Sequence, residues 1–431
     1  MLLAAPSWAG SRVEDLNIAL HEYVDKSPVF TTSARTRAQT YVRAVTPKAD
    51  GMTPAEFLLT VLRIAALADN GHDTEHDKDD VWFPESRLPV RMIWFPNDWV
   101  IARTDSAHSD LLGGCVLTIE GRSADQLFRS LRKYWGGPDT SRRWNLEWLV
   151  ENSGLLHAAG LARQADRLEI TVRRIDGRQV TRTLFFEPKA LLPEGQYAER
   201  VWSPEPWPGE AEKAWQAFTP RSTPLYLRDG ARYFRVVHLP ELEALFIQLR
   251  IHFDAPGETV AEFCKHVDEM VEHLHPHNLI VDERFDTGGN IDLTREWQRQ
   301  LVARIPGRIY ILIGRYTFSA GIVAAAAFKH DAADRARLIG EPVGDRLRWW
   351  SEGTDVCMPN SKYCIHQSTG LWDLVRGCSG DSACYGDKYD ARVRDLEPDI
   401  AAPLTSQMWL AGQDPAMDAI QRDLSETRAA R

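Results

Sequence analysis

The fold class of this chain is decided by Leu279-Ile-Val-Asp-Glu-Arg-Phe-Asp-Thr-Gly-Gly-Asn290 and the later Ile309-Tyr-Ile-Leu-Ile-Gly-Arg-Tyr-Thr-Phe-Ser-Ala-Gly321. In each segment an apolar run typical of a buried strand leads into a polar turn with small residues, where a backbone can approach a substrate. An alanine-rich helix pattern begins directly after Ser319. A serine there has its hydroxyl at the positive end of a helix dipole, beside free N–H groups that can stabilise a developing oxyanion.

Strand and helix patterns alternate around these two segments. Strands that alternate with helices at this spacing indicate right-handed βαβ crossovers and a largely parallel sheet, so we predict an α/β fold for the C-terminal half. The predicted strands are 244–250, 279–282 and 309–313, and the predicted helices are 258–273, 292–304 and 320–330.

The remainder of the chain has a different character. A helical pattern runs from Arg12 to about Asp69, and Asn70-Gly71 predicts a helix end just before His72. The middle region has short β-like runs at 90–95, 99–103, 115–119, 167–172 and 181–186, with a helical insert at 123–134. Because 203–224 is rich in proline, we predict three parts: a helical region 1–78, a β-rich module 79–202 and a core 203–431.

Length and charge narrow the function classes. The 431 residues exceed one usual domain, and the net charge is -10, from 61 acidic against 51 basic residues. No basic run is long enough to follow a phosphate backbone, so nucleic acid is not an expected partner. No stretch approaches the roughly 20 apolar residues that cross a bilayer.

Four of the six cysteines crowd one segment: Cys357, Cys364, Cys378 and Cys384. We expect disulfides within this group, because neither close pair has the two-residue spacing of a zinc knuckle, although free thiols or a metal site stay open. The apolar N-terminus 1–10 could be the end of an export signal or a frayed start. Together these features favour a periplasmic or secreted protein.

Taken alone, Ser319 is best explained as a helix N-cap. Its neighbours change that interpretation, because several motifs in order resemble those of the S41 serine peptidases, which include the C-terminal processing proteases and the tricorn core. The similar segments are 70–72 (Asn-Gly-His), 113–121, 279–290, 317–321, 339–342 (Ile-Gly-Glu-Pro) and 396–400 (Leu-Glu-Pro-Asp-Ile).

The resemblance implies a ClpP/crotonase-like spiral for the C-terminal half, a PDZ-like module in the middle, and hydrolysis of a peptide or protein substrate. It implies Ser319 as nucleophile and His72 as general base. The backbone N–H of Gly288 or Gly289, with that of Ala320, would form the oxyanion hole. No metal or organic cofactor is required by this chemistry.

The chain departs from the processing-protease branch at the lysine base, because Gly344 is followed by Asp345. Lys329 lies on the helix after the serine and would have to reach back along it, so the histidine branch of the family fits better. That branch also uses a carboxylate, for which Glu352 is the candidate and Asp390 the alternative. An exposed loop residue is an equally good interpretation of Glu352.

Two other functions are open. His72-Asp-Thr-Glu-His76 has the H-x-x-E-H pattern of zinc metallopeptidases, in which Glu75 would act beside the two histidines and Glu147 or Glu151 could be the third ligand. This motif needs a helix, which Asn70-Gly71 is expected to end. A protein that binds peptides or a small ligand without cutting them is the second alternative, since one fold hosts many functions.

Overall fold

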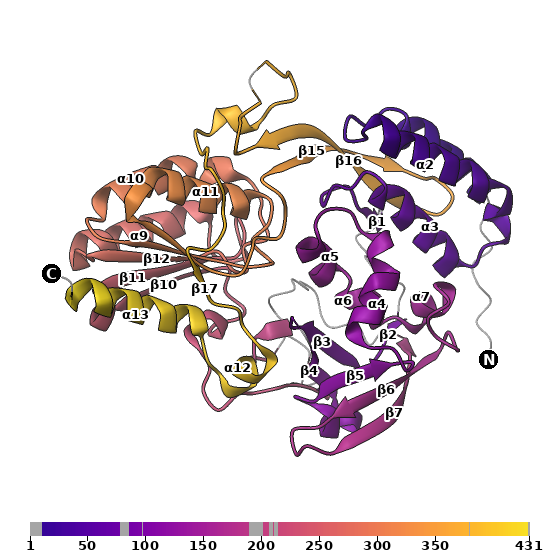
Figure 1. Cartoon of the computed structure of the whole chain (residues 1–431), viewed down its shortest axis with the longest axis horizontal. Helices are drawn as coiled ribbons and strands as arrows, with labels where there is room; N and C mark the ends of the chain where they lie inside the picture. The colour runs from indigo at the N-terminus through magenta and orange to yellow at the C-terminus, as the bar shows by residue number, and fades with distance from the viewer. Residues whose placement is uncertain are drawn as a thin grey trace.

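The C-terminal half is built on a six-stranded sheet in the order β10-β11-β12-β13-β14-β17 (Figure 1). From β11 to β17 neighbouring strands are parallel, and β10 runs antiparallel to β11. The predicted α/β class and its three central strands are therefore confirmed. The strands are β10 (Phe234–Leu239), β11 (Ala244–Leu249), β12 (Asn278–Asp282), β13 (Ile309–Ile313), β14 (Ala336–Gly340) and β17 (Ile400–Ala401).

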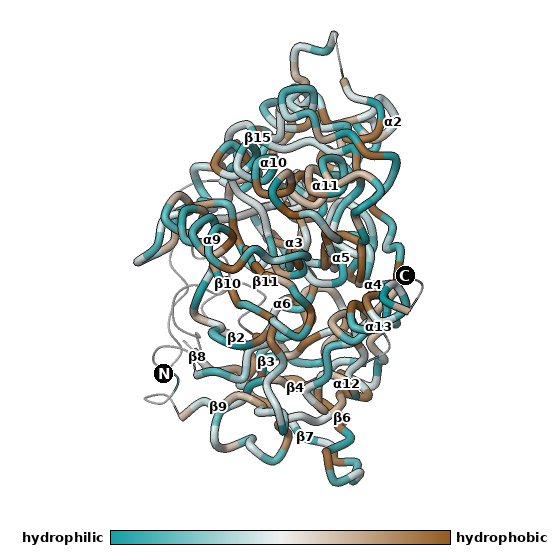
Figure 2. Tube along the Cα trace, turned by 90° about the vertical axis from the view of Figure 1, so that its left-hand side faces the viewer, coloured by the Kyte–Doolittle hydropathy of each residue, from teal (hydrophilic) through white to brown (hydrophobic). Residues whose placement is uncertain are grey.

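Helices cover both faces of this sheet. Helices α9 (Val260–Leu274), α10 (Arg295–Arg304) and α11 (Ala320–Ala332) lie on one face, and α13 (Pro415–Ala429) lies on the other (Figure 1). Successive strand residues point to opposite faces, so Leu245 packs with the first group of helices while Phe246 packs under α13. Burial on both faces explains why these strands are continuously apolar. Hydrophobic and hydrophilic residues alternate along the outer helix α9 (Figure 2), as a helix with one buried face requires.

The middle of the chain is a second sheet, in the order β3-β4-β5-β6-β7, with β9 paired to β4. The β-rich region and its helical insert are thus confirmed. The elements are β3 (Val90–Trp94), β4 (Trp99–Asp105), β5 (Cys115–Ile119), β6 (Arg167–Arg173), β7 (Gln179–Phe185), β9 (Trp215–Ala217), α4 (Ala124–Leu131), α5 (Asp139–Asn145), α6 (Glu147–Val150) and α7 (Ser153–Ala158).

The N-terminal part consists of α1 (Arg12–Ile18), α2 (Thr32–Val45) and α3 (Pro54–Ala66). The last helix ends at Ala66, earlier than the Asn70-Gly71 end predicted from the sequence. The tertiary structure is the reason, because Asp69 takes φ 56° and Asn70 bonds to the backbone of Trp350 instead of extending the helix.

A long hairpin joins the C-terminal half to the N-terminal helices (Figure 1). Its strands, β15 (Arg348–Cys357) and β16 (Tyr363–Asp373), form a sheet with β1 (Glu75–Asp77), and its Met358 and Ile365 pack among the N-terminal helices.

Two disulfides brace this region. Cys357–Cys364 links the two strands of the hairpin, and Cys378–Cys384 closes the loop that follows β16. The predicted pairing within the cysteine cluster is confirmed.

The structure describes residues 11–77, 86–96, 98–188, 201–206, 210, 214–378 and 380–429, so the possible export signal at 1–10 lies outside the described residues. Among the described helices, none has the length and apolar character needed to span a bilayer.

Candidate active site

Ser319 occupies a strained turn between β13 and α11. Its backbone has φ 54° and ψ -122°, a conformation that residues other than glycine rarely adopt. Although Ser319 holds the N-cap position, its hydroxyl makes no capping hydrogen bond. The plain N-cap interpretation therefore fails. In hydrolases of another fold, a sharp strand-to-helix turn of this kind exposes the nucleophilic serine.

The Gly288-Gly289 turn lies against this serine. Both glycines have positive φ, 110° and 134°. A Cβ on Gly288 would lie 2.5 Å from Cβ of Ser319 and 3.0 Å from the backbone nitrogen of Ala320. Only glycine fits there, so the turn can approach the serine closely.

The N–H groups of this turn are not equivalent. Gly288 donates its N–H to Oδ1 of Asp286 at 2.9 Å, so this N–H is already engaged. Within the described residues, no hydrogen bond is recorded for the N–H of Gly289 or of Ala320. Of the three expected oxyanion donors, these two are free to bind a developing charge.

His72 is delivered by a short anchored loop. On one side of it, the side chain of Asn70 pairs with the backbone of Trp350, donating to its oxygen at 2.8 Å and accepting from its nitrogen at 3.1 Å. On the other side, Asp73 accepts a hydrogen bond from the hydroxyl of Tyr23 at 2.8 Å. The His72 ring is thereby stacked on Phe318, the residue before Ser319, with centroids 4.4 Å apart and planes at 22°.

His72 is a neutral imidazole at neutral pH. Burial lowers its pKa to about 3, so one ring nitrogen has a free lone pair, while the buried ring is a weaker base than an exposed histidine. Neither ring nitrogen has a hydrogen-bond partner among the described residues. A buried imidazole without partners is costly unless a substrate completes its bonds.

Asp345 is the carboxylate beside this histidine. Its Oδ2 lies 3.8 Å from Nδ1 of His72, while its Oδ1 accepts the N–H of Arg346 at 2.7 Å. The side chain is 2% exposed, and burial raises its pKa to about 7. A separation of 3.8 Å is longer than a hydrogen bond, but such contacts often shorten when substrate binds.

Asp345 is not among the site residues predicted from the sequence. It follows Gly344, at the position where the processing-protease branch of the family would have its lysine base. A carboxylate there has a use if the base is a histidine, because it can orient the ring.

The two carboxylates predicted from the sequence make no contact with His72 among the described residues. Glu352 is exposed on β15 with φ 51°, and its backbone oxygen lies 3.1 Å from Nε2 of His366. Asp390 is exposed and pairs with Arg299 and His330. Lys329 bonds to Asp395 at 2.9 Å. No contact joins these three side chains to His72 in the described part of the chain.

The zinc-site interpretation is not favoured. Residues Glu75–Asp77 form strand β1, so the helix that H-x-x-E-H requires is missing, while the side chains of Glu75 and His76 lie outside the described residues. Glu147 accepts the backbone N–H of Trp94 at 2.9 Å, and Glu151 accepts that of Met92 at 2.7 Å. Both carboxylates thus tie α6 to β3.

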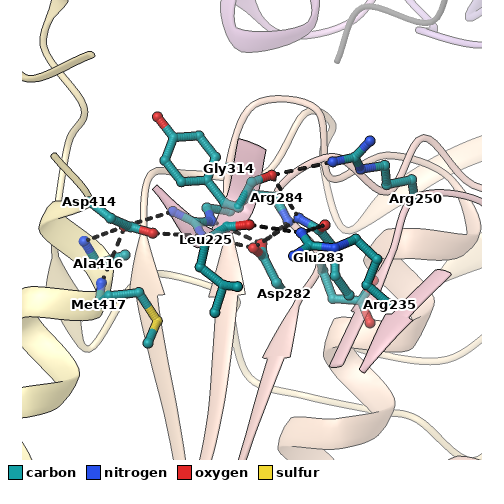
Figure 3. A network of polar contacts seen from close by, with 12 residues as sticks. Leu225, Arg235, Arg250, Asp282, Glu283, Arg284, Gly314, Asp414, Ala416 and Met417 are labelled. Carbon is teal, nitrogen blue, oxygen red and sulfur yellow. Dashed lines mark hydrogen bonds and ion pairs between the residues drawn. The ribbon is translucent and has the colours of Figure 1, made fainter. Parts of the chain in front are cut away.

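The charged residues that open the Gly-Gly motif have a structural role (Figure 3). Arg284 forms ion pairs with Asp282 at 2.8 Å and with Asp414 at 2.9 Å. Asp414 in turn accepts the N–H groups of Ala416 and Met417 at the start of α13. This network fixes α13 to the end of β12.

The two free cysteines do not compete as nucleophiles. Burial raises the pKa of Cys115 to about 11 and that of Cys264 to about 12, so both stay thiols at neutral pH.

Neither a protein-family model nor a curated protein sequence matches the chain. Among solved structures, mature CPAF aligns at 13% identity with a TM-score of 0.57 over 96% of both chains. Mature CPAF in complex with lactacystin aligns at 13% identity with a TM-score of 0.57, over 97% of this chain and 98% of that chain. The photosystem II D1 C-terminal processing protease aligns at 13% identity with a TM-score of 0.41, over 96% of this chain and 97% of that chain. This chain therefore shares the overall fold of mature CPAF.

Proposed function

We propose that this chain is a serine endopeptidase of the S41 type. The observation that carries the proposal is the His72 ring, which stacks on Phe318, the residue directly before a strained serine whose hydroxyl caps nothing. Oγ of Ser319 attacks the carbonyl carbon of the peptide bond, while His72 accepts the proton of the serine hydroxyl. The N–H groups of Gly289 and Ala320 bind the oxyanion, and His72 then protonates the leaving amine. Water attacks the acyl-enzyme by the reverse proton path and regenerates the serine.

Asp345 is the proposed positioning residue for His72. A carboxylate beside Nδ1 holds the tautomer in which Nε2 is free to accept the serine proton, and it stabilises the imidazolium that forms. The burial of Asp345 beside the ring favours it over Glu352, which is exposed. Glu352 stays the second candidate for this role.

The substrate and location follow from the same proposal. The β-rich module would act as a PDZ-like selector, and the substrate backbone would add to a sheet edge. Two disulfides support an exported protein, periplasmic or secreted. The fold likeness to mature CPAF, which binds lactacystin, and the resemblance of the ordered motifs support hydrolysis rather than simple carriage.

A covalent probe tests the assignment directly. A fluorophosphonate reacts only with an activated serine, so we expect one adduct per chain, mapped by peptide mass spectrometry to Ser319. Peptide cleavage should be lost in proportion to labelling and should be unaffected by a chelator. A protein that binds peptides but is neither labelled nor able to cleave would be a carrier. Chelator-sensitive cleavage without labelling would restore a metallopeptidase.

Cleavage should depend on pH through Asp345. Its folded pKa is raised to about 7, so the carboxylate that orients His72 is ionised above this pH and protonated below it. We expect kcat/KM to fall as the pH drops through about 7, with no second acidic step above pH 5. Rates measured from pH 5 to 9 on a short peptide check this, and a flat profile across pH 6 to 8 would argue against Asp345.

Replacing Gly288 by alanine should damage the oxyanion hole. The new Cβ would meet Cβ of Ser319 at 2.5 Å, so the turn must move away from the serine. Losing one oxyanion donor lowers kcat by about 10² to 10³. The matched control is Gly257→Ala, because Gly257 also has positive φ, 87°, but open space around its Cβ. An equal loss of activity in both variants would mean that backbone strain at a positive φ causes it, and not the close approach of residue 288 to Ser319.

A further inference from the structure

A buried polar cluster lies behind the Gly288-Gly289 turn, outside the set of residues that would touch the substrate. It consists of His252, Glu283 and Asp286, and each of the three is 0% exposed. Nε2 of His252 lies 2.6 Å from Oδ2 of Asp286, although the two groups are not aligned as a hydrogen bond. The opposite nitrogen, Nδ1, lies 2.9 Å from Oγ1 of Thr294. Burying such groups is costly, so the cluster needs a structural or functional reason.

Asp286 joins the two halves of the proposed site. Its Oδ1 accepts the N–H of Gly288 at 2.9 Å, and its backbone oxygen accepts the N–H of Phe318 at 2.9 Å. The first bond holds the glycine turn, and the second holds the residue before Ser319. One residue therefore sets the distance between the oxyanion turn and the nucleophile loop.

His252 holds the same turn from the other side. Its N–H donates to the oxygen of Gly288 at 2.7 Å, and its oxygen accepts the N–H of Asn290 at 2.8 Å. A Cβ on Gly289 would lie 2.6 Å from the oxygen of His252, so the two backbones are in direct contact. With both flanking peptides fixed, the free N–H of Gly289 is held in one direction.

We propose that His252 and Asp286 form a positioning pair that keeps the Gly288-Gly289 turn in the conformation able to bind the oxyanion. This inference rests on the proposed peptidase function. Two consecutive glycines at positive φ have many accessible conformations, and rotation of the peptide between them would turn the Gly289 N–H away. An oxyanion hole is effective only when its donors are fixed in advance. The side chain of His252 lies 2.6 Å from Oδ2 of Asp286, on the side of the carboxylate opposite the bond from Oδ1 to Gly288.

Glu283 is the third member of the cluster. Burial, and after it the neighbouring Asp286, raise the pKa of Glu283 well above its usual value, which favours the neutral form of this side chain.

A metal ion is a weaker explanation of these three side chains, although their donor atoms lie within 4.8 Å of one another. The contact of 2.6 Å between Nε2 and Oδ2 is shorter than the separation of two ligands on tetrahedral zinc, roughly 3.3 Å for bonds of about 2.0 Å. The geometry therefore favours a direct contact between the imidazole and the carboxylate.

Variants of the pair separate positioning from simple stability. Asp286→Leu removes the acceptor of the Gly288 N–H, and we expect kcat to fall by about 10² to 10³ with KM changed by less than about twofold. Asp286→Asn keeps an oxygen for that N–H and should retain kcat to within about tenfold. The kcat of His252→Leu should lie between those of Asp286→Leu and Asp286→Asn. This variant replaces Asp286→Leu in the test if Asp286→Leu does not fold. Tyr310→Phe, which breaks the partly buried bond of 2.6 Å from β13 of the same sheet to Asp423 on α13, is the control for losing a polar contact.

Hydrogen exchange provides a readout that does not require activity. Exchange of the segment 283–290 should speed up in Asp286→Leu and His252→Leu, but not in Asp286→Asn or Tyr310→Phe. If the wild type is neither labelled nor active, the peptidase proposal fails, and the exchange data still decide whether the pair holds the turn. Wild-type kcat and exchange in a folded Asp286→Leu would overturn the positioning pair. One equivalent of tightly bound metal in the purified wild type would overturn it in favour of a metal site.

Discussion

Replacing Ser319 by alanine is expected to lower kcat by about 10⁴ to 10⁶ without lowering the melting temperature. The catalytic loss follows from removing the attacking oxygen. Stability should be retained because the hydroxyl makes no capping hydrogen bond and the backbone conformation does not depend on it. Initial rates of peptide cleavage and a thermal melt of the same preparations measure both parts.

Ser123→Ala is the matched control for this substitution. Ser123 is also a serine at a helix N-cap, but its hydroxyl accepts the N–H of Gln126 in a capping box at the start of α4. Its loss should cost about 1 kcal/mol of stability and leave cleavage unchanged. We therefore expect Ser319→Ala to lose cleavage but keep its stability, and Ser123→Ala to lose stability but keep cleavage. A Ser319→Ala protein that melts earlier and still cleaves would return Ser319 to the role of a helix cap.

Asp345→Asn is expected to lower kcat by about 10⁴, the effect of leaving a catalytic histidine in the wrong tautomer. The amide can donate to Nδ1 of His72, which moves the ring proton to Nε2 and blocks acceptance of the serine proton. Because the substituted side chain does not titrate, the acidic limb of the pH profile near 7 should also disappear. Steady-state rates of both proteins across the same pH range provide the measurement.

Glu352→Gln is the counterpart of this variant. The side chain is exposed, so its substitution should change neither kcat nor the pH profile by more than about twofold. If Glu352→Gln loses the activity and Asp345→Asn keeps it, the orienting carboxylate is Glu352 and substrate binding must bring it to His72.

The fold was largely accessible from the sequence because its signals are local. Strands β5 and β13 have the predicted bounds, since apolar runs ended by glycine and polar turns mark a buried strand wherever it packs. Helix α3 shows the limit of such signals. Asn-Gly is a good helix stop, but the helix ends earlier because Asn70 has a partner, Trp350, that only the tertiary structure provides.

The site was accessible only in part for the same reason. The order of the motifs predicted Ser319, His72 and the glycine turn as site residues. In the structure, all three lie next to Phe318. The contact between His72 and Asp345 depends on two loops from opposite ends of the chain. No spacing rule connects such residues. The same holds for the pair of His252 and Asp286, in which the histidine follows a strand and carries no motif of its own.

The long hairpin has a consequence for how the chain folds. Strand β1, the residues buried beneath the N-terminal helices and the bonds that hold Asn70 all need partners from β15 and β16, synthesised nearly 300 residues later. Contacts of such sequence separation form late, because loop closure must come first. On the ribosome, the N-terminal part would therefore wait with its core incomplete and its histidine unplaced until the hairpin emerges. A chain interrupted before β15 would contain Ser319 but would lack the assembled candidate site, so the order of synthesis would delay the proposed proteolysis.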